Sequence, residues 1–258
     1  MGKFDGILLM SDLDGTLCEG GKVSPENCQA IAYFQSEGGL FSIGSGRKPD
    51  WLLEWTDYFV PNTYSAMLNG SIICDPRGEN PIFIQPCDPD VVEISQKILS
   101  LCPNARSMTY CGCFEPNLEV KMGEEIDYGK LPQQIFKCLL QIPDQYSDEY
   151  ADTVRRALPS NYISMRSWIR GIEFQKAGTG KGEAIHRLKA HLGDAARLAV
   201  AVGNYENDLD MIVAADIGYA VGDSISSVIA AADRVTVPCC EHSIAAIIEE
   251  LEHRHDLL

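Results

Sequence analysis

Short apolar segments alternate with amphipathic segments in both terminal parts of the chain. In the last third, helix and strand patterns follow one another in strict alternation, at 181–192, 198–202, 207–215, 217–221, 224–232, 234–237 and 243–251. Strands that alternate with helices of about 10 residues favour a parallel sheet covered by helices on both faces. We therefore predict an α/β fold with a doubly wound parallel sheet.

The first third of the chain has the same order. An apolar strand is expected at 4–10 and a helix begins after Ser24, because Ser is a favourable N-cap and Pro25 suits the first helical position. Gly38 and Gly39 supply the helix stop. A second strand is expected at 40–43, a third near Met67, and a hairpin over 72–84.

The middle of the chain differs in composition. Residues 86–171 hold most of the aromatic and proline clusters, with helical patterns over 91–101 and 131–140. This shift predicts an inserted α+β domain at 86–171, and a larger domain built from 1–85 and 172–258.

Charge and composition limit the classes of partner that the chain is expected to bind. The net charge is −16 and no stretch gathers Lys and Arg, so a nucleic-acid partner is not expected. No apolar run approaches the ~20 residues that a membrane-spanning helix needs. The ten cysteines, without a secretion signal, predict reduced thiols and a cytoplasmic location. Residues 252–258 are expected to form a loose tail.

Polar side chains follow the predicted strands of the sheet. Because ligands of doubly wound sheets bind at the carboxyl ends of the strands, these groups should converge on one edge. They are Asp12 and Asp14 after the first strand, Ser45 and Arg47 after the second, Asn69 after the third, Asn204, Asn207 and Asp208 after the fourth, and Lys181 at the start of a helix.

This set of groups suits phosphoryl transfer. Asp12 and Asp14, with further oxygen donors nearby, make a pocket that attracts Mg²⁺. Asp12 has the chemistry of a nucleophile and Asp14 that of a general acid and base. Ser45 and Lys181 supply a hydroxyl and an ammonium for the transferring oxygens. "GTGKGE" is not a Walker loop, because Gly182 follows the lysine where Ser or Thr is required.

Four motifs in order carry a resemblance to a known family. They are "DLDGT" at 12–16, "GSGR" around Ser45, Lys181-Gly182, and "GNYENDLDM" at 203–211. The chain resembles the haloacid dehalogenase-like hydrolases, most closely the Cof-type phosphatases with a type II cap. The resemblance implies a nucleophilic Asp12, an acid/base Asp14 with its carbonyl on Mg²⁺, and phosphate contacts from Ser45 and Lys181.

The same resemblance assigns the remaining groups. Asn69 matches the rim loop of the family, and 86–171 matches the position of the cap. Arg47 and Asn207 join the phosphate and substrate site by their positions after the predicted strands, although Arg47 equally fits a structural ion pair. The metal set is Asp12, Asp14, Asn204 and Asp208. The family usually has Asp where this chain has Asn204, so weaker metal binding is expected.

The predicted function is a magnesium-dependent phosphatase of small phosphorylated metabolites, with sugar phosphates among the candidates. A phosphomutase of the same fold is one alternative. A non-catalytic binding or regulatory relative is the other, although retention of Asp12, Asp14, Ser45 and Lys181 argues against it. In the predicted cap, Arg166, Trp168 and Arg170 fit either substrate selection or the exposed side of a strand.

Overall fold

The computed structural model describes residues 2–253, which form two compact units. The first unit contains the described residues up to Phe83 and from Gly180 onward. The second unit is Ile84–Thr179. It begins before the predicted insertion at 86–171 and ends after it. The later end arises because residues 171–176 form a strand that pairs with strands of the second unit.

The first unit is built on a five-stranded parallel sheet, which confirms the predicted fold class. The strands, in spatial order, are β15 (Arg234–Val235), β14 (Ile217–Ala220), β13 (Leu198–Gly203), β1 (Ile7–Ser11) and β4 (Leu40–Ile43). Every residue of β1, which lies between β13 and β4, is buried. A strand that is buried on both faces has apolar side chains on both faces. For that reason residues 7–10 are all apolar and do not alternate with polar residues.

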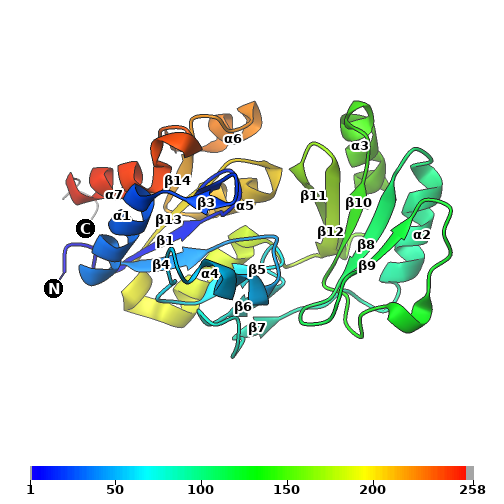
Figure 1. Ribbon diagram of the computed structural model, residues 1–258, viewed down its shortest axis with the longest axis horizontal. Helices are drawn as coiled ribbons and strands as arrows, with labels where there is room; N and C mark the ends of the chain where they lie inside the picture. Colours follow the sequence, from blue (N-terminus) through cyan, green and yellow to red (C-terminus); the bar gives the residue numbers. More distant parts are fainter. Residues whose placement is uncertain (1, 254–258) are drawn as a thin grey trace. The chain divides into compact units, whose positions relative to one another are not determined.

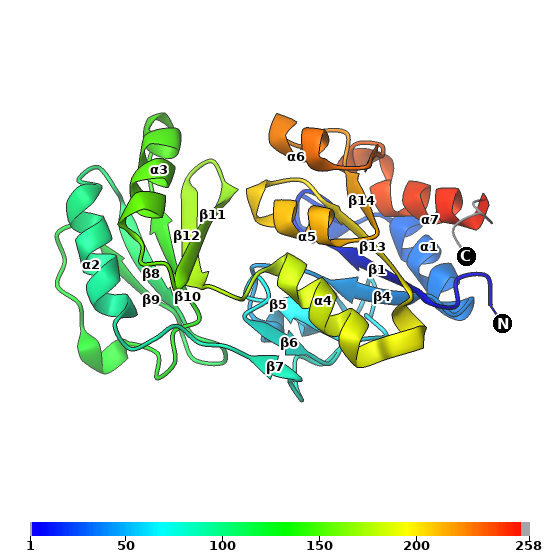
Figure 2. The same cartoon turned by 180° about the vertical axis from the view of Figure 1, so that it is seen from behind.

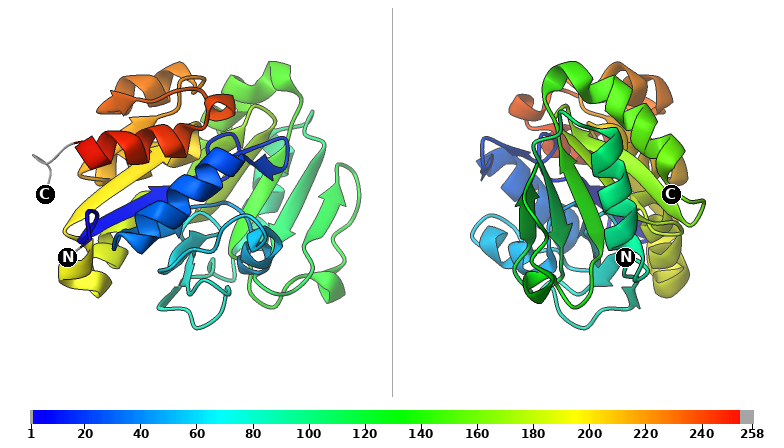
Figure 3. Two further views of the ribbon diagram at one scale, coloured as in Figure 1. Left: turned by 60° about the vertical axis from the view of Figure 1, so that its left-hand side comes forward. Right: turned by 90° about the vertical axis from the view of Figure 1, so that its right-hand side faces the viewer.

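Helices cover both faces of this sheet. They are α1 (Pro25–Ser36), α4 (Lys181–Leu192), α5 (Leu209–Ala214), α6 (Ser226–Ala231) and α7 (Ser243–His253). Helices α1 and α7 lie side by side on one face (Figure 1; Figure 3, left), and α4 and α5 lie on the other (Figure 2). Leu8 and Met10 of β1 pack with Ile185 and Met211 in the core on the α4 and α5 side.

Helix α1 shows how local sequence sets an element. The Ser24 side chain accepts a hydrogen bond from the Asn27 backbone at 3.2 Å, and Pro25 occupies the first turn. Gly38, with a φ of 88°, follows the helix in a conformation that favours glycine. Both predicted ends of this helix are confirmed.

The remaining elements of the first unit are short. They are the hairpin β2 (Cys18–Glu19) and β3 (Lys22–Val23), the strands β5 (Ser65–Met67), β6 (Ile72–Cys74) and β7 (Phe83–Ile84), and the 3₁₀ helices η1 (Pro49–Trp55), η4 (Gly193–Ala196), η5 (Glu206–Asp208) and η6 (Cys239–Glu241). The second residue of β7, Ile84, is the first residue of the second unit. Strands β5, β6 and β7 form a separate small sheet. Helix α7 includes residues 252 and 253 of the expected tail, and 254–258 lie outside the described residues.

The second unit is an antiparallel sheet with helices on one face (Figure 2). The strands, in spatial order, are β11 (Tyr162–Trp168), β12 (Gly171–Lys176), β10 (Lys137–Gln141), β8 (Ser107–Cys111) and β9 (Leu118–Lys121). The helices are α2 (Val91–Leu101), α3 (Ser147–Ala157) and the 3₁₀ helices η2 (Tyr128–Lys130) and η3 (Asp144–Tyr146).

One helix prediction in this unit is wrong. The stretch 131–140 was expected to be helical, but residues 137–141 form β10. Cys138 and Leu140 alternate along the strand and are both fully buried in the core of this unit. This spacing of two is the period of a strand, so pairing with β8 and β12 overrides the helical pattern.

None of the described helices has the length and apolar character needed to cross a membrane. All ten cysteines fall within the described residues and none of them is in a disulfide, in agreement with the predicted reduced state.

Aromatic packing under α1 yields a stability prediction. Phe34 is fully buried, and its ring centroid lies 4.8 Å from that of Phe4. Phe34→Ala should lower the free energy of unfolding by about 3–5 kcal/mol, because it leaves a cavity in the core. Urea denaturation measures this, with the exposed Val213→Ala on α5 as the control, which should change stability by less than about 0.5 kcal/mol.

Candidate active site

The loop after β1 starts as a continuation of the strand. The Asp12 backbone N–H donates to the carbonyl of Val202 on β13 at 2.9 Å, which extends the parallel register past Ser11. Asp12 is buried, at 6 % exposure. Gly15 then turns the chain with a φ of 79°, and its N–H bonds the Cys18 carbonyl at 2.9 Å. The predicted nucleophile is therefore held by the backbone of the sheet.

A buried lysine joins two of the predicted carboxylates. The Lys181 Nζ lies 2.7 Å from Oδ1 of Asp12 and 2.6 Å from Oδ1 of Asp208. Lys181 and Asp208 have no exposed surface. Two carboxylates and one ammonium leave this cluster one positive charge short of neutrality when both acids are ionised, which favours binding of a further cation.

The protonation of these groups follows from burial and from one another. Burial, reinforced by the charge of Asp208, raises the pKa of Asp12 to about 7, although Lys181 opposes that rise. Burial disfavours the ammonium of Lys181, but Asp12 and Asp208 outweigh it and raise its pKa above the ordinary value. Lys181 is therefore a permanent cation beside the predicted nucleophile.

Asp208 is anchored through both oxygens. While Oδ1 binds Lys181, Oδ2 accepts the backbone N–H groups of Asn204 and Tyr205 at 2.9 and 3.1 Å. The carboxylate thus fixes the loop after β13 as well as the lysine. A side chain at Gly15 would collide with the amide of Asn204, so that amide lies against the loop that follows Asp14.

Ser45, Asn69 and Asn207 also come together. The Asn69 N–H donates to the Ser45 carbonyl at 2.9 Å, and Nδ2 of Asn207 donates to Oδ1 of Asn69 at 3.4 Å. All three are buried. Leu68 and Asn69 both have a φ of 50°, a conformation that non-glycine residues seldom adopt and that gathers at functional sites.

Asp14 pairs with Arg47, for which the sequence allowed either a substrate contact or a structural ion pair. Nε and Nη2 of Arg47 donate to the two oxygens of Asp14 at 2.7 and 2.6 Å, a bidentate ion pair. The Arg47 guanidinium also lies 4.1 Å from the ring centroid of Trp51. In this structure Arg47 therefore forms an ion pair, at the edge of the same site.

Two residues that the sequence analysis did not single out support the site. Oδ2 of Asp210 accepts the N–H of Gly182 at 3.0 Å and so holds the first turn of α4, which carries Lys181. Trp51 stacks on Arg47 from η1. Asp210 lies inside "GNYENDLDM", so its place in that motif could have indicated a role at the site. Nothing in the local sequence points to Trp51.

The donor set fits Mg²⁺. It would consist of oxygens from the Asp12 carboxylate, the Asp14 carbonyl and the Asn204 amide, which are hard ligands of the kind that Mg²⁺ takes. Among the described residues no group of three or more His, Cys, Asp or Glu side chains could hold a metal ion. A site with few carboxylates suits a cation that keeps waters and binds substrate phosphate.

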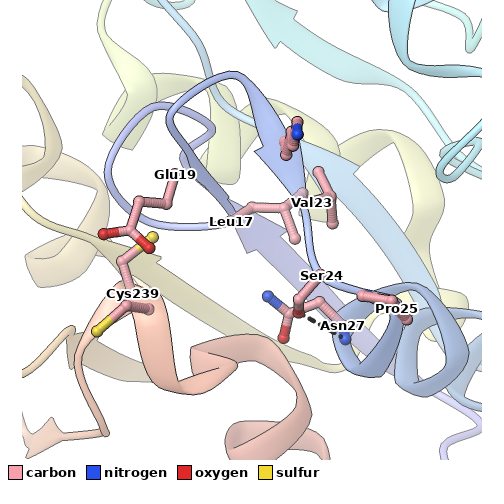
Figure 4. A pocket seen from close by; sticks show the side chains of 9 residues that line it. Leu17, Glu19, Val23, Ser24, Pro25, Asn27 and Cys239 are labelled. Atoms are coloured by element: carbon pink, nitrogen blue, oxygen red, sulfur yellow. Dashed lines mark hydrogen bonds between the residues drawn. The ribbon is translucent and has the colours of Figure 1, made fainter.

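A cavity elsewhere in the first unit is separate from these residues. It has a volume of about 240 Å³ and lies beside the β2–β3 hairpin (Figure 4). Its lining residues are Leu17, Glu19, Lys22, Val23, Ser24, Pro25, Asn27, Cys239 and Cys240. None of the predicted site residues is among them.

The arginines singled out in the second unit form ion pairs within that unit. Arg166 donates to Asp148 at 2.6 Å, and Arg170 pairs with Asp144. Trp168 is 38 % exposed. These pairs match the structural interpretation of the two arginines, whose role in substrate selection stays a prediction.

This chain is similar to known proteins in both sequence and fold. The model of the haloacid dehalogenase-like hydrolase family matches residues 9–248. A Bacillus subtilis relative, 5-amino-6-(5-phospho-D-ribitylamino)uracil phosphatase YitU, is 22 % identical, over 94 % of this chain and 96 % of its own. Among solved structures, the subclass IIB sugar phosphatase BT4131 matches with a TM-score of 0.78 and 20 % identity, over 95 % of this chain and 98 % of its own.

A second solved structure supports the same fold. SMU.1108c from Streptococcus mutans matches with a TM-score of 0.81 and 19 % identity, over 94 % of this chain and 97 % of its own. At these identities the likeness is one of fold, and it extends over nearly all of each chain.

The buried lysine yields a stability prediction. Lys181→Met should lower the free energy of unfolding by about 3 kcal/mol at neutral pH, because Asp12 and Asp208 then face each other without a cation. Thermal unfolding measures the change. Lys189→Met on the same helix, which loses only a half-exposed pair with Asp216, should cost about 1 kcal/mol or less. Equal losses in the two variants would contradict the prediction.

Proposed function

Because the chain belongs to the haloacid dehalogenase-like hydrolases, we propose that it releases phosphate from small phosphorylated metabolites through an aspartyl-phosphate on Asp12. It is a phosphoric monoester hydrolase, and the phosphatase YitU and the sugar phosphatase BT4131 support a small phosphate ester as substrate. The ten free cysteines support a reducing, cytoplasmic location.

The observation that carries the proposal is the position of Lys181 between Asp12 and Asp208. An ammonium at 2.7 Å from the Asp12 carboxylate keeps one of its oxygens oriented and favours its ionised form. Oδ2 of Asp12 is then the oxygen that attacks phosphorus. The same ammonium offsets the negative charge of the transferring phosphoryl oxygens.

The reaction proceeds in two balanced steps. A carboxylate oxygen of Asp12 forms a bond to phosphorus while the ester oxygen leaves, and that oxygen takes a proton from Asp14. A water then attacks phosphorus and gives its proton to Asp14, and the bond between phosphorus and Asp12 breaks. Phosphate leaves, Asp12 is again a carboxylate, and Asp14 again carries the proton for the next leaving group. The carboxylate form of Asp14, which Arg47 binds, is the form between the two steps.

The neighbouring polar groups bind the phosphoryl oxygens. The Ser45 hydroxyl accepts the Arg47 N–H at 3.2 Å and has its own proton to donate. Asn69 and Asn207 present buried amides at the same edge of the sheet. Arg47 adds a cation on the side of Asp14, where the leaving group departs. These donors replace water around a dianionic phosphate.

Mg²⁺ would be held by Asp12, the carbonyl of Asp14 and Asn204, and when bound it supplies positive charge to the phosphoryl group. We assign Asp208 to orientation of Lys181 and of the 203–205 loop, because its two oxygens receive three N–H donors. Asn204 brings an oxygen without a charge, so the site binds Mg²⁺ more weakly than one with a third carboxylate.

Asp12→Asn should abolish turnover, since an amide oxygen does not form the acyl phosphate. Phosphate release from a panel of phosphate monoesters with Mg²⁺ measures this. The control is Asp57→Asn, an exposed position that should retain wild-type rates. Turnover that survives in the Asp12 variant would rule out the nucleophile assignment. Wild-type turnover that appears only as isomerisation, with a bisphosphorylated activator added, would favour a phosphomutase.

Asn204→Asp should lower the Mg²⁺ concentration that gives half-maximal rate, because the new carboxylate adds a charged ligand. Calorimetric titration of Mg²⁺ into the substrate-free protein should show the same increase in affinity. Glu206→Gln, which changes charge in the same loop at a half-buried side chain, is the control for general electrostatics. Unchanged or weaker Mg²⁺ binding in the Asn204 variant contradicts the ligand role.

A further inference from the structure

Asp14 is oriented by a chain of two contacts. Its side chain is 55 % exposed, so packing does little to fix its conformation. Arg47 holds both carboxylate oxygens at 2.7 and 2.6 Å, and the ring of Trp51 lies 4.1 Å from the guanidinium. A guanidinium at this distance from an indole face is attracted by the ring and stacks on it.

The backbone places Trp51 for this contact. The carbonyl of Arg47 accepts the N–H of Leu68 at 2.9 Å, which ties the arginine to the loop that carries Asn69. Pro49 then starts η1, and Trp51 lies four residues after Arg47. The guanidinium therefore has a fixed backbone at one end and a flat aromatic surface along its side.

Trp51 differs in this respect from the other tryptophan of η1. Trp55 is 7 % exposed and its ring lies 5.9 Å from the guanidinium, as expected of a core residue. Trp51 stays 37 % exposed and contributes less to the core. Its ring lies 4.1 Å from the guanidinium that binds Asp14, so its position serves the site more than the fold.

We infer that Trp51 is a positioning residue for the leaving-group step, acting on Asp14 through Arg47. The inference rests on the proposed function, in which Asp14 gives its proton to the ester oxygen as the bond from phosphorus to oxygen breaks. Asp14 is then a carboxylate, and the bidentate pair with Arg47 stabilises that product. Trp51 keeps the guanidinium in place to receive it.

The test compares two esters that differ in their need for a proton. An alkyl phosphate needs one on its leaving oxygen, whereas p-nitrophenolate leaves without it. The value of kcat/KM reports steps up to departure of the leaving group. Trp51→Ala should lower kcat/KM for an alkyl phosphate about tenfold, through misplacement of Asp14, and change that for p-nitrophenyl phosphate little.

Two variants serve as matched controls. Trp51→Phe keeps an aromatic face under Arg47 and should restore most of the alkyl phosphate activity. Leu53→Ala, at an exposed position of the same 3₁₀ helix, should leave both esters at wild-type values. Asp14→Asn should show the same selective loss as Trp51→Ala, to a greater extent.

The outcomes separate the two levels of the proposal. Equal losses of kcat/KM for both esters in Trp51→Ala indicate a general structural role and overturn the inference. No loss for either ester overturns it as well. A wild-type protein that releases phosphate from neither ester overturns the proposed function itself. A selective loss that Phe restores supports the positioning role.

Discussion

The buried ammonium of Lys181 is the interaction on which the site depends. Asp12, Lys181 and Asp208 come from three segments that are far apart in the chain, and the lysine contacts both acids at 2.7 and 2.6 Å. Without it two carboxylates would face each other in the interior, at a large cost in desolvation and repulsion. The geometry of α4 follows from this requirement, since Asp210 holds its first turn and Lys181 is its first residue.

Asn204, whose side chain is uncharged, lies close to a cluster that already carries excess negative charge. Asp12 and Asp208 already exceed Lys181 by one charge when both are ionised, and burial raises the pKa of Asp12 to about 7. A third acid at position 204 would increase repulsion in the protein without metal and bind Mg²⁺ more tightly. The amide reduces both effects. In the proposed Mg²⁺ site, stability and metal affinity are thus opposed at this position.

Much of the site was predictable because parallel strands share an edge. Asp12, Ser45 and Asn204 follow three strands of the parallel sheet, and their convergence needs only the alternation of strands and helices. Asn69 follows β5 of the separate small sheet and joins them through its N–H bond to the Ser45 carbonyl. The error at 131–140 has a different origin. Leu131, Ile135 and Cys138 recur at helical spacing, whereas Cys138 and Leu140 have the spacing of a strand. Only pairing with β8 and β12 decides between the two patterns.

The sequence by itself determined which chemical groups are present, their order along the chain and the edge of the sheet at which they meet. Only the tertiary structure decided how the charges pair: Asp12 and Asp208 with Lys181, and Asp14 with Arg47 over Trp51. The physical reason is that an ion pair or a stacked ring depends on distances of a few ångströms. Periodicity and motif spacing place a residue on an element, but they do not determine distances between side chains that the chain separates by tens of residues or more.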